Sequence, residues 1–231
     1  MVTIFQTYNQ MHLKIIFPAI ICLFLSCRSD QLTNSYIYFD QPQPLKVKEI
    51  TSFPKKYTVM FTRDYSHFMK IEPNYVISIQ INRLEATKKQ MDSLPDFEFK
   101  NNVVYDKETQ KAFKTYVKND TIQWETENRD TLFSFAGNEI AKIYKSNLIL
   151  NKKIDGKYLV NVIKFDLSGN KYLQLGTRND FAKIQNELQI AFNPIVEKND
   201  TVGVVLKPSR SDFWKLLHLD GFEYEKIYYF K

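Results

Sequence analysis

The sequence predicts a mainly β protein, an antiparallel meander that forms a barrel-like or strongly curved sheet with two or three short helices. The first observation is an alternation of apolar and polar residues over 75–82, which is the period of a strand with one buried face. The second is a series of turn-forming residues at intervals of about nine residues between 119 and 156, as expected for consecutive hairpins. The third is a pair of helix-capping sequences late in the chain.

Residues 1–26 are predicted to be a signal peptide. Lys14 is their single charged residue, and an apolar run over 15–25 follows it. This run has the length of a signal-peptide core, about 7–15 residues, and is shorter than the roughly 20 apolar residues of a membrane-spanning helix. Because residues 1–10 carry no charge, translation from Met11 gives a more typical signal than translation from the first residue.

The apolar run ends in Phe24-Leu25-Ser26-Cys27, which resembles the lipobox of bacterial lipoproteins. In that family the cysteine thiol receives a diacylglycerol, the chain is cleaved just before the cysteine, and the new α-amine is acylated with a chain such as palmitate. The resemblance implies cleavage between Ser26 and Cys27 and lipidation of Cys27. Cys22 follows Ile21 in place of a small residue, so we expect it to be discarded with the signal peptide.

An acylated Cys27 would hold the protein on a membrane, since each buried methylene contributes about 0.8 kcal/mol and two or more chains anchor stably. The predicted partner is therefore membrane lipid, and the predicted location is the cell envelope after export. Arg28 stands where an aspartate favours inner-membrane retention in enterobacterial lipoproteins. The outer membrane is therefore favoured over the inner membrane.

Residues 27–55 are predicted to be the lipidated cysteine followed by an extended tether. Gln41-Pro42-Gln43-Pro44 favours polyproline-like backbone, and Ser52-Phe53-Pro54 adds a second break. Between Cys27 and these breaks, Tyr36–Phe39 has the composition of a strand that could pair with the body at an edge.

Residues 56–231 are predicted to be a single β-rich domain, and about 10–12 strands are predicted over residues 36–231. Asp155-Gly156 is the strongest hairpin signal, because a type I′ turn needs positive φ at both central residues. Residues 158–167 are apolar on both faces, which indicates a central strand covered on each side. Two sequential subdomains joined near residues 95–102 are the alternative. The other predicted turns are Asn119-Asp120, Asn128, Gly137-Asn138 and Ser146-Asn147.

The capping sequences predict two helices. Thr177-Arg178-Asn179-Asp180 precedes apolar residues spaced for one buried face, and Ser209-Arg210-Ser211-Asp212 repeats the pattern. Gly221 is placed to end the second helix. A weaker helix is expected over 85–93, ended by Pro95.

No catalytic residue, metal site or cofactor is predicted. His67 and His218 are the histidines that follow the signal peptide, and a zinc site needs three or four closely spaced ligands. Asp64 and His67, with Glu72 nearby, could supply a base and an orienting acid, but a solvated turn is the simpler interpretation. His218 follows the second predicted helix, where a cation stabilises the helix end.

Two carboxylate pairs are spaced to share one strand face, as a glycosidase would need and as any solvent-exposed strand also shows. They are Glu125 with Glu127 and Glu223 with Glu225. No phosphate-binding or nucleophile-elbow motif occurs, and the chain has only 6 glycines for such loops. The composition therefore favours a protein that is not an enzyme.

The basic excess does not indicate a nucleic-acid partner. The chain has 32 Lys and Arg against 26 Asp and Glu, and removal of the signal peptide takes away one Lys, leaving a net charge of +5. The lysines are scattered through turns with acidic residues between them, whereas a nucleic-acid-binding surface gathers them on one face.

Aromatic residues on predicted strands are the remaining candidates for a site. They can line the mouth of a barrel and bind an apolar ligand or a sugar, or they can fill the core as cross-strand pairs, which is commoner. They are Tyr57, Tyr75, Tyr105, Tyr116, Trp124, Tyr144, Tyr158 and Tyr172.

The chain resembles the small uncharacterised lipoproteins of Bacteroidota in its lipobox, its Pro-Gln-Pro spacer and the Phe53-Pro54-Lys55-Lys56-Tyr57 entry into the body. That group has no activity to transfer. The leading hypothesis is a lipid-anchored envelope protein with a non-catalytic binding or structural role, whose partner would be an envelope protein or a hydrophobic ligand. A lipocalin-like barrel that carries a hydrophobic ligand is the alternative, and an envelope hydrolase is the third hypothesis.

Overall fold

A computed structural model describes residues 36–166 and 169–230, which form a mainly β fold as predicted. One large sheet contains 14 strands, and a second sheet contains 2. The signal peptide, Ser26 and Cys27 lie outside the described residues. From Tyr36 onward the chain forms one compact unit.

Most strands belong to a part of the fold that we call the body, residues 36–77, 131–166 and 169–230. Its strands are β1 (Ile37–Phe39), β2 (Glu49–Ile50), β3 (Met60–Thr62), β4 (His67–Ile71), β10 (Glu139–Tyr144), β11 (Asn147–Ile154), β12 (Lys157–Lys164), β13 (Asn170–Gln174), β14 (Phe192–Glu197), β15 (Asp200–Leu206) and β16 (Tyr224–Phe230). A short 3-10 helix, η1 (Lys55–Tyr57), precedes β3.

The chain order of the body strands follows the predicted meander only in part. β10, β11, β12 and β13 pair in sequence and antiparallel, and the turn between β11 and β12 has positive φ at Asp155 (47°) and Gly156 (77°), which confirms the type I′ prediction. β1 lies between β12 and β15 and pairs with β15 in parallel. The sheet is strongly curved and does not close into a barrel, because β14 ends its order with one neighbour.

Both faces of the central strands are covered, as the apolar pattern of residues 158–167 predicts. Val160 and Val162 of β12 enter a core on one face, and Ile163 enters a core on the other. β11 alternates in the same way, with Ile149 facing the first core. The hydrophobic residues of these strands therefore hold two layers onto one sheet.

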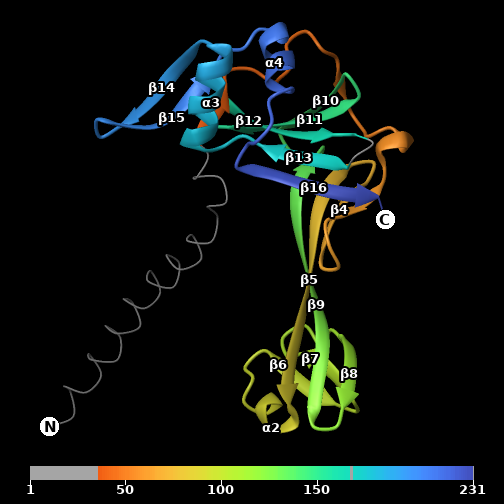
Figure 1. The fold of residues 1–231 in the computed structure, drawn as a ribbon. Coiled ribbons are helices and arrows are strands. Elements are labelled where there is room, and N and C mark those ends of the chain that lie inside the picture. The colour runs from red at the N-terminus through yellow and green to blue at the C-terminus, as the bar shows by residue number, and fades with distance from the viewer. Residues whose placement is uncertain (1–35, 167–168, 231) are drawn as a thin grey trace, which may run out of the picture. The chain divides into compact units, whose positions relative to one another are not determined.

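Two capped helices cover the first of these faces. Thr177 and Ser209 are the N-cap residues of α3 (Arg178–Leu188) and α4 (Arg210–Leu216), and each helix has the complete capping box that the sequence predicts. Ile184 of α3 and Phe213 of α4 are fully buried in the first core. Figure 1 shows both helices above strands β12 and β13 of the body sheet.

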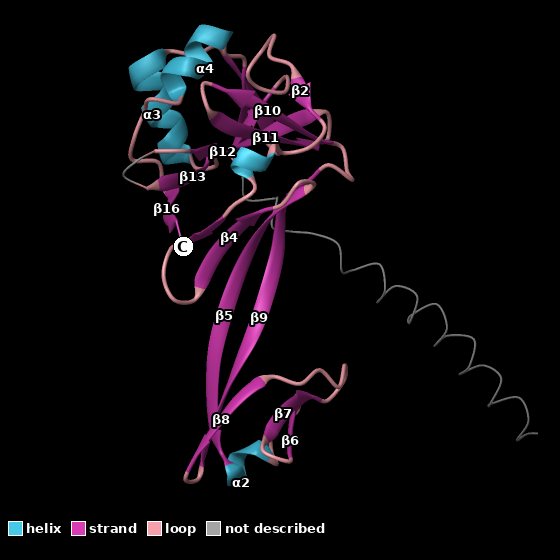
Figure 2. Ribbon diagram, turned by 90° about the vertical axis from the view of Figure 1, so that its right-hand side faces the viewer, coloured by secondary structure: helices cyan, strands magenta, loops and turns pink. Residues whose placement is uncertain are grey.

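Two long strands, β5 (Tyr75–Thr87) and β9 (Thr121–Ser134), extend out of the body and carry a third, smaller core (Figures 1 and 2). Their outer ends form what we call the tip, residues 83–125, together with α2 (Lys88–Met91), β6 (Phe97–Lys100), β7 (Val103–Asp106) and β8 (Lys114–Lys118). The tip core consists of Ala86, Met91, Val104, Ile122 and Trp124. Residues 78–82 and 126–130, which we call the arm, join the tip to the body.

The tip changes three predictions. Asn128 is not a turn, because β9 continues through it and pairs with β5 along the whole arm. The helix expected over 85–93 shrinks to α2, since residues up to Thr87 complete the β5–β9 ladder. Residues 95–102 lie inside the tip, which is inserted into the body, and do not join two sequential subdomains.

The described residues form 16 strands, more than the predicted 10–12, because short strands such as β2 carry little sequence signal.

The predicted extended tether is also corrected over residues 36–55, which are part of the folded body. Phe39 is fully buried in the first core and Phe53 is buried in the second. Lys142 of β10, itself buried, donates hydrogen bonds through Nζ to the carbonyl oxygens of Pro42 (2.8 Å) and Pro44 (3.0 Å). The backbone carbonyl groups of this segment therefore accept hydrogen bonds from the sheet, and burial lowers the pKa of Lys142.

Candidate functional site

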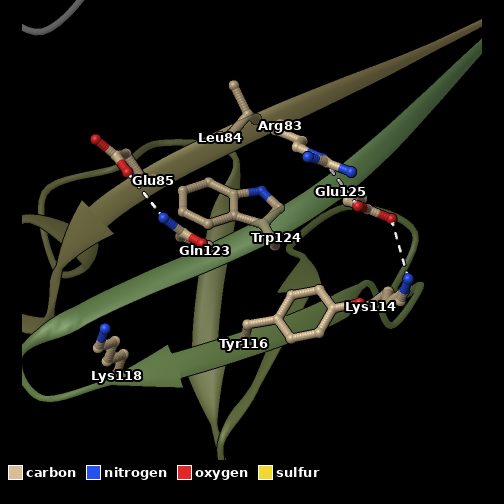
Figure 3. Close-up of a pocket in the computed structure, with 9 residues that line it drawn as sticks. All are labelled: Arg83, Leu84, Glu85, Lys114, Tyr116, Lys118, Gln123, Trp124 and Glu125. Atoms are coloured by element: carbon tan, nitrogen blue, oxygen red, sulfur yellow. Dashed lines mark hydrogen bonds and ion pairs between the residues drawn. The ribbon is translucent and has the colours of Figure 1, made fainter. Parts of the chain in front are cut away.

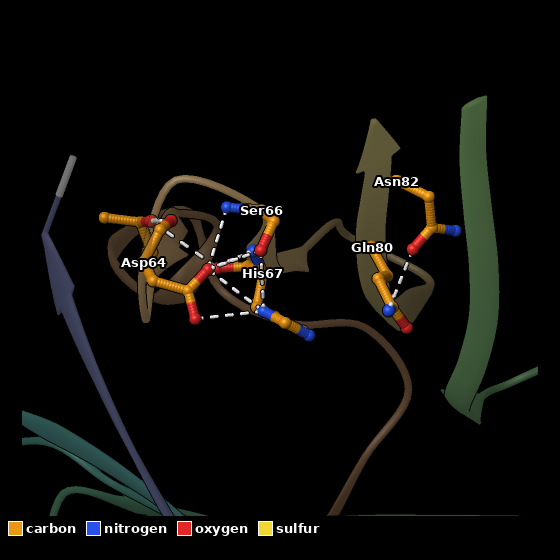
Figure 4. A network of polar contacts seen from close by, with 6 residues as sticks. Asp64, Ser66, His67, Gln80 and Asn82 are labelled. Atoms are coloured by element: carbon orange, nitrogen blue, oxygen red, sulfur yellow. Dashed lines mark hydrogen bonds and ion pairs between the residues drawn. The ribbon is translucent and has the colours of Figure 1, made fainter. Parts of the chain in front are cut away.

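The predicted acid–base pair Asp64 and His67 lies in a tight turn before β4 (Figure 4). The Asp64 carboxylate lies 2.9 Å from His67 Nδ1, and its Oδ1 accepts hydrogen bonds from the backbone N–H groups of Ser66 (2.8 Å) and His67 (2.9 Å). These hydrogen bonds, that from the Ser66 backbone above all, hold the pKa of Asp64 well below its ordinary value. The carboxylate stabilises the turn through these hydrogen bonds, as the simpler interpretation of the sequence expects.

Glu72 does not join this pair. It follows the far end of β4, five residue steps along the chain from His67, which corresponds to roughly 16 Å of extended strand. Glu72 instead forms an ion pair with Lys70. The three residues named for a hydrolase therefore do not converge on one reacting position.

The other predicted groups have separate local partners. His218 donates from Nδ1 to the carbonyl oxygen of Trp214 (2.8 Å), at the end of α4 as predicted. Glu127 pairs with Arg129, and Glu225 pairs with Lys171 (2.8 Å). Glu223 precedes β16 and accepts a hydrogen bond from Asn179, so it does not form a pair with Glu225 on that strand.

The aromatic residues divide between core and surface. Within the described residues Tyr57, Trp124, Tyr144 and Tyr172 are buried, Tyr105 and Tyr158 are partly buried, and Tyr75 and Tyr116 are exposed. The barrel interior that a lipocalin-like ligand requires is not formed by the open sheet. The exposed Tyr116, however, lies in a groove.

This groove, with a volume of about 690 Å³, lies across the three tip strands β5, β9 and β8 (Figure 3). We call it the tip groove. Its lining residues are Arg83, Leu84, Glu85, Lys114, Tyr116, Lys118, Gln123, Trp124 and Glu125.

Strand pairing arranges the polar lining in transverse rows. Arg83, Glu125 and Lys114 are opposite one another on β5, β9 and β8, and so share one face of the sheet. The next row on the same face contains Glu85, Gln123 and Tyr116. Figure 3 shows the charged groups of the first row and the Tyr116 ring of the second. This sheet face is therefore a polar surface with one aromatic ring.

The intervening residues point to the opposite face, because side chains alternate along a strand. Leu84 and Trp124 form such a row, and the indole of Trp124 packs against Phe97 with ring centroids 5.2 Å apart. The tip core therefore supports the groove from behind. Trp124 Nε1 is buried there without a hydrogen-bond partner among the described residues.

Ion pairs order the first row. Glu125 accepts a hydrogen bond from Arg83 Nε (3.1 Å) and lies 3.5 Å from Lys114 Nζ. A hydrogen bond with Tyr116 and the charge of Glu125 raise the pKa of Lys114, whose Nζ lies 5.2 Å from the centre of the Tyr116 ring. In the second row Gln123 donates to Glu85 (3.1 Å). Lys118, at the end of β8, has no ion-pair partner within the described residues.

The sequence analysis names Tyr116, Trp124 and Glu125 as candidates but does not bring them together. The lining residues come from β5, β8 and β9, and α2 and the small β6–β7 sheet lie between β5 and β8 in the sequence. No local motif therefore marks the groove. The predicted Asn119-Asp120 turn does point to the β8–β9 hairpin. The same turn sequence, Lys-Asn-Asp-Thr followed by an aliphatic residue, occurs at residues 118–122 and again at residues 198–202 in the β14–β15 hairpin, so it does not mark a binding site.

No protein-family model, curated protein or solved structure shows significant similarity to this chain. None of the helices in the described part of the chain has the length and apolarity needed to cross a bilayer. Over residues 36–166 and 169–230, no three His, Cys, Asp or Glu side chains gather as metal ligands.

Proposed function

We propose that this protein is a lipid-anchored component of the cell envelope that binds a partner through its tip groove and has no catalytic role. The observation that carries the binding role is the position of the groove. It lies on a small, separate core that the β5–β9 arm joins to the body.

The arm contributes little to the stability of the fold. This favours a binding role for the tip that it carries. Beyond its own ladder the arm is supported, among the described strands, by β4 alone, which pairs with residues 78–80, and residues 78–82 and 126–130 belong to none of the three buried clusters. A ribbon with so little support is marginally stable in water. The tip core adds little to the two body cores. A tip of this kind is useful for the surface that it presents, and the tip groove is a polar hollow in that surface.

The anchor rests on the sequence. The basic residue Lys14, the apolar run 15–25 and the lipobox-like Phe24-Leu25-Ser26-Cys27 support export followed by acylation of Cys27. Two or three acyl chains would keep the protein on the membrane, more favourably the outer membrane because Arg28 follows the cysteine.

The anchor is tested by replacing each cysteine of the full-length chain in turn. Cys27→Ala should abolish incorporation of labelled palmitate and shift the protein from the membrane pellet to the soluble fraction. Cys22→Ala is the matched control, since this cysteine precedes the cleavage position, and it should leave both readouts unchanged. Retention of label and of membrane association in the Cys27→Ala protein would refute the anchor.

A further inference from the structure

We propose that the ligand of the tip groove is an acidic saccharide, a chain of sugar units that carry carboxylate or sulfate groups. This proposal rests on the binding role proposed above and specifies the chemistry of the partner. Charge, the exposed ring and the shape of the sheet face each contribute to the choice.

The charge of the groove favours an anion. Three cations and two carboxylates line it, a net charge of +1. Both carboxylates already have partners, since Glu125 contacts Arg83 and Lys114 and Glu85 accepts from Gln123. Lys118 is left without an ion-pair partner in the described part of the chain. An anionic group could therefore bind beside Lys118 without breaking an existing ion pair.

The neighbouring cations can also turn toward a ligand. The Arg83 side chain is 77% exposed and the Lys114 side chain is 65% exposed. Exposed ion pairs contribute little to stability, so exchanging part of the Glu125 contact for a ligand carboxylate or sulfate carries a small penalty. The guanidinium of Arg83 also has the planar fork that matches either group.

The aromatic ring favours a sugar over a simple ion. Tyr116 is 49% exposed on the groove side of β8, with Gln123 and Glu85 in the same cross-strand row. The C–H face of a pyranose can stack on such a ring while its hydroxyls reach the amide and carboxylate beside it. The ring and its polar neighbours therefore match the two surfaces of a sugar unit.

The sheet face is poorly suited to apolar ligands and to peptide side chains. Pockets for such ligands are lined mainly by apolar groups, whereas the two apolar members of the lining, Leu84 and Trp124, face the tip core. Rows of polar side chains repeat along the face at the spacing of strand residues. An extended chain of hydroxylated rings can contact successive rows.

The test is calorimetric titration of the full chain, purified in detergent, with four probes. They are hexagalacturonate, a heparin-derived hexasaccharide, neutral maltohexaose and hexaglutamate. Binding of either acidic saccharide, at least about tenfold tighter than maltohexaose and hexaglutamate, would support the proposal. Equal binding of maltohexaose would show that the groove does not distinguish charged from neutral saccharides. Equal binding of hexaglutamate would identify a site for acidic peptides. Either result, or no binding of any probe, would overturn it.

Two variants locate the site. Tyr116→Ala and Lys118→Gln should each weaken acidic-saccharide binding by about tenfold, as truncation of a central contact does. The matched controls are Tyr65→Ala and Lys226→Gln, which change an exposed tyrosine and an exposed lysine of the body. All four changes are at exposed positions, and circular dichroism would verify folding. Equal losses in the variants and the controls would overturn the assignment to the groove.

These outcomes are separable from those of the anchor. Titration of purified protein does not depend on acylation, and palmitate labelling at Cys27 does not depend on saccharide binding. A failed titration would leave the anchor in place, and a failed labelling experiment would leave the groove in place.

Discussion

The body and the tip are built from the same kinds of strand but have very different cores. The two body clusters contain seventeen and thirteen buried apolar residues, whereas the tip cluster contains five. The body buries both faces of its sheet, while the tip buries one face and leaves the other to solvent. The comparison indicates that the body supplies the stability of the chain and that the tip can open locally without unfolding it.

The largest effect is expected from the body core. Phe213 is fully buried and packs edge-on against Phe39, with ring centroids 6.2 Å apart. Phe213→Ala should lower the free energy of unfolding by about 3–5 kcal/mol, because it leaves a cavity between α4 and the sheet. Denaturant unfolding followed by far-UV circular dichroism measures it, and Tyr65→Ala at a 94% exposed side chain should change little. A loss as small as that of the control would mean that this core is not well packed.

The tip core should respond locally. Trp124 is 2% exposed and is the largest side chain of its cluster. Trp124→Ala should lower the free energy of local opening by about 3–5 kcal/mol and should leave the body transition in place. Hydrogen exchange by mass spectrometry should show lost protection in β7, β8 and the first residues of β9. Equal loss of protection in β11 and β12 would contradict the separation of tip from body.

A smaller effect is expected at the β11–β12 turn of the body. Gly156 has φ of 77°, a conformation that costs a residue with a side chain about 1–2 kcal/mol. Gly156→Ala should therefore lower the free energy of unfolding by that amount. Gly137→Ala is the control, since its backbone is not left-handed and an added Cβ comes no closer than 4.0 Å to a neighbour. An equal loss of unfolding free energy in Gly137→Ala would show that the effect comes from replacing any glycine and not from the positive φ of Gly156.

The smallest effect concerns Asp64. The folded state lowers its pKa, so the carboxylate stabilises the fold above its ordinary pKa of about 3.9, and this stabilisation is lost as the pH falls through the lowered value. Asp64→Asn removes that dependence. The stability difference between wild type and variant should be constant near neutral pH and should shrink below about pH 4. Unfolding midpoints at pH 2–7 measure it, and parallel curves across this range would contradict the role of the turn.

Much of the body could be predicted because its signals are local. The capping boxes at Thr177 and Ser209 and the turn at Asp155-Gly156 depend on a few adjacent residues, and the structure confirms all three. The two-sided apolar pattern of β12 likewise reports burial directly. Each of these features specifies its own geometry without information from distant segments.

The errors arose where a distant partner decides the structure. Asn128 is a residue type typical of turns, but it pairs with Gln80 of β5, and β9 therefore continues through it. The Pro-Gln-Pro segment reads as a spacer, but Lys142 and Asn151, about 100 residues later, hydrogen-bond to it. The tip groove was not predicted for the same reason. Its rows unite residues from three strands, and only strand register places Arg83, Glu125 and Lys114 side by side.

The central claim is that the tip groove, and not the body, is the binding surface. Hydrogen exchange of the full chain with and without hexagalacturonate tests it most directly. We expect slower exchange confined to the groove strands, residues 83–87, 114–118 and 121–125, with unchanged exchange in β10 to β13 of the body. Protection that appears in the body strands, or no change in the tip at saturating ligand, would contradict the account.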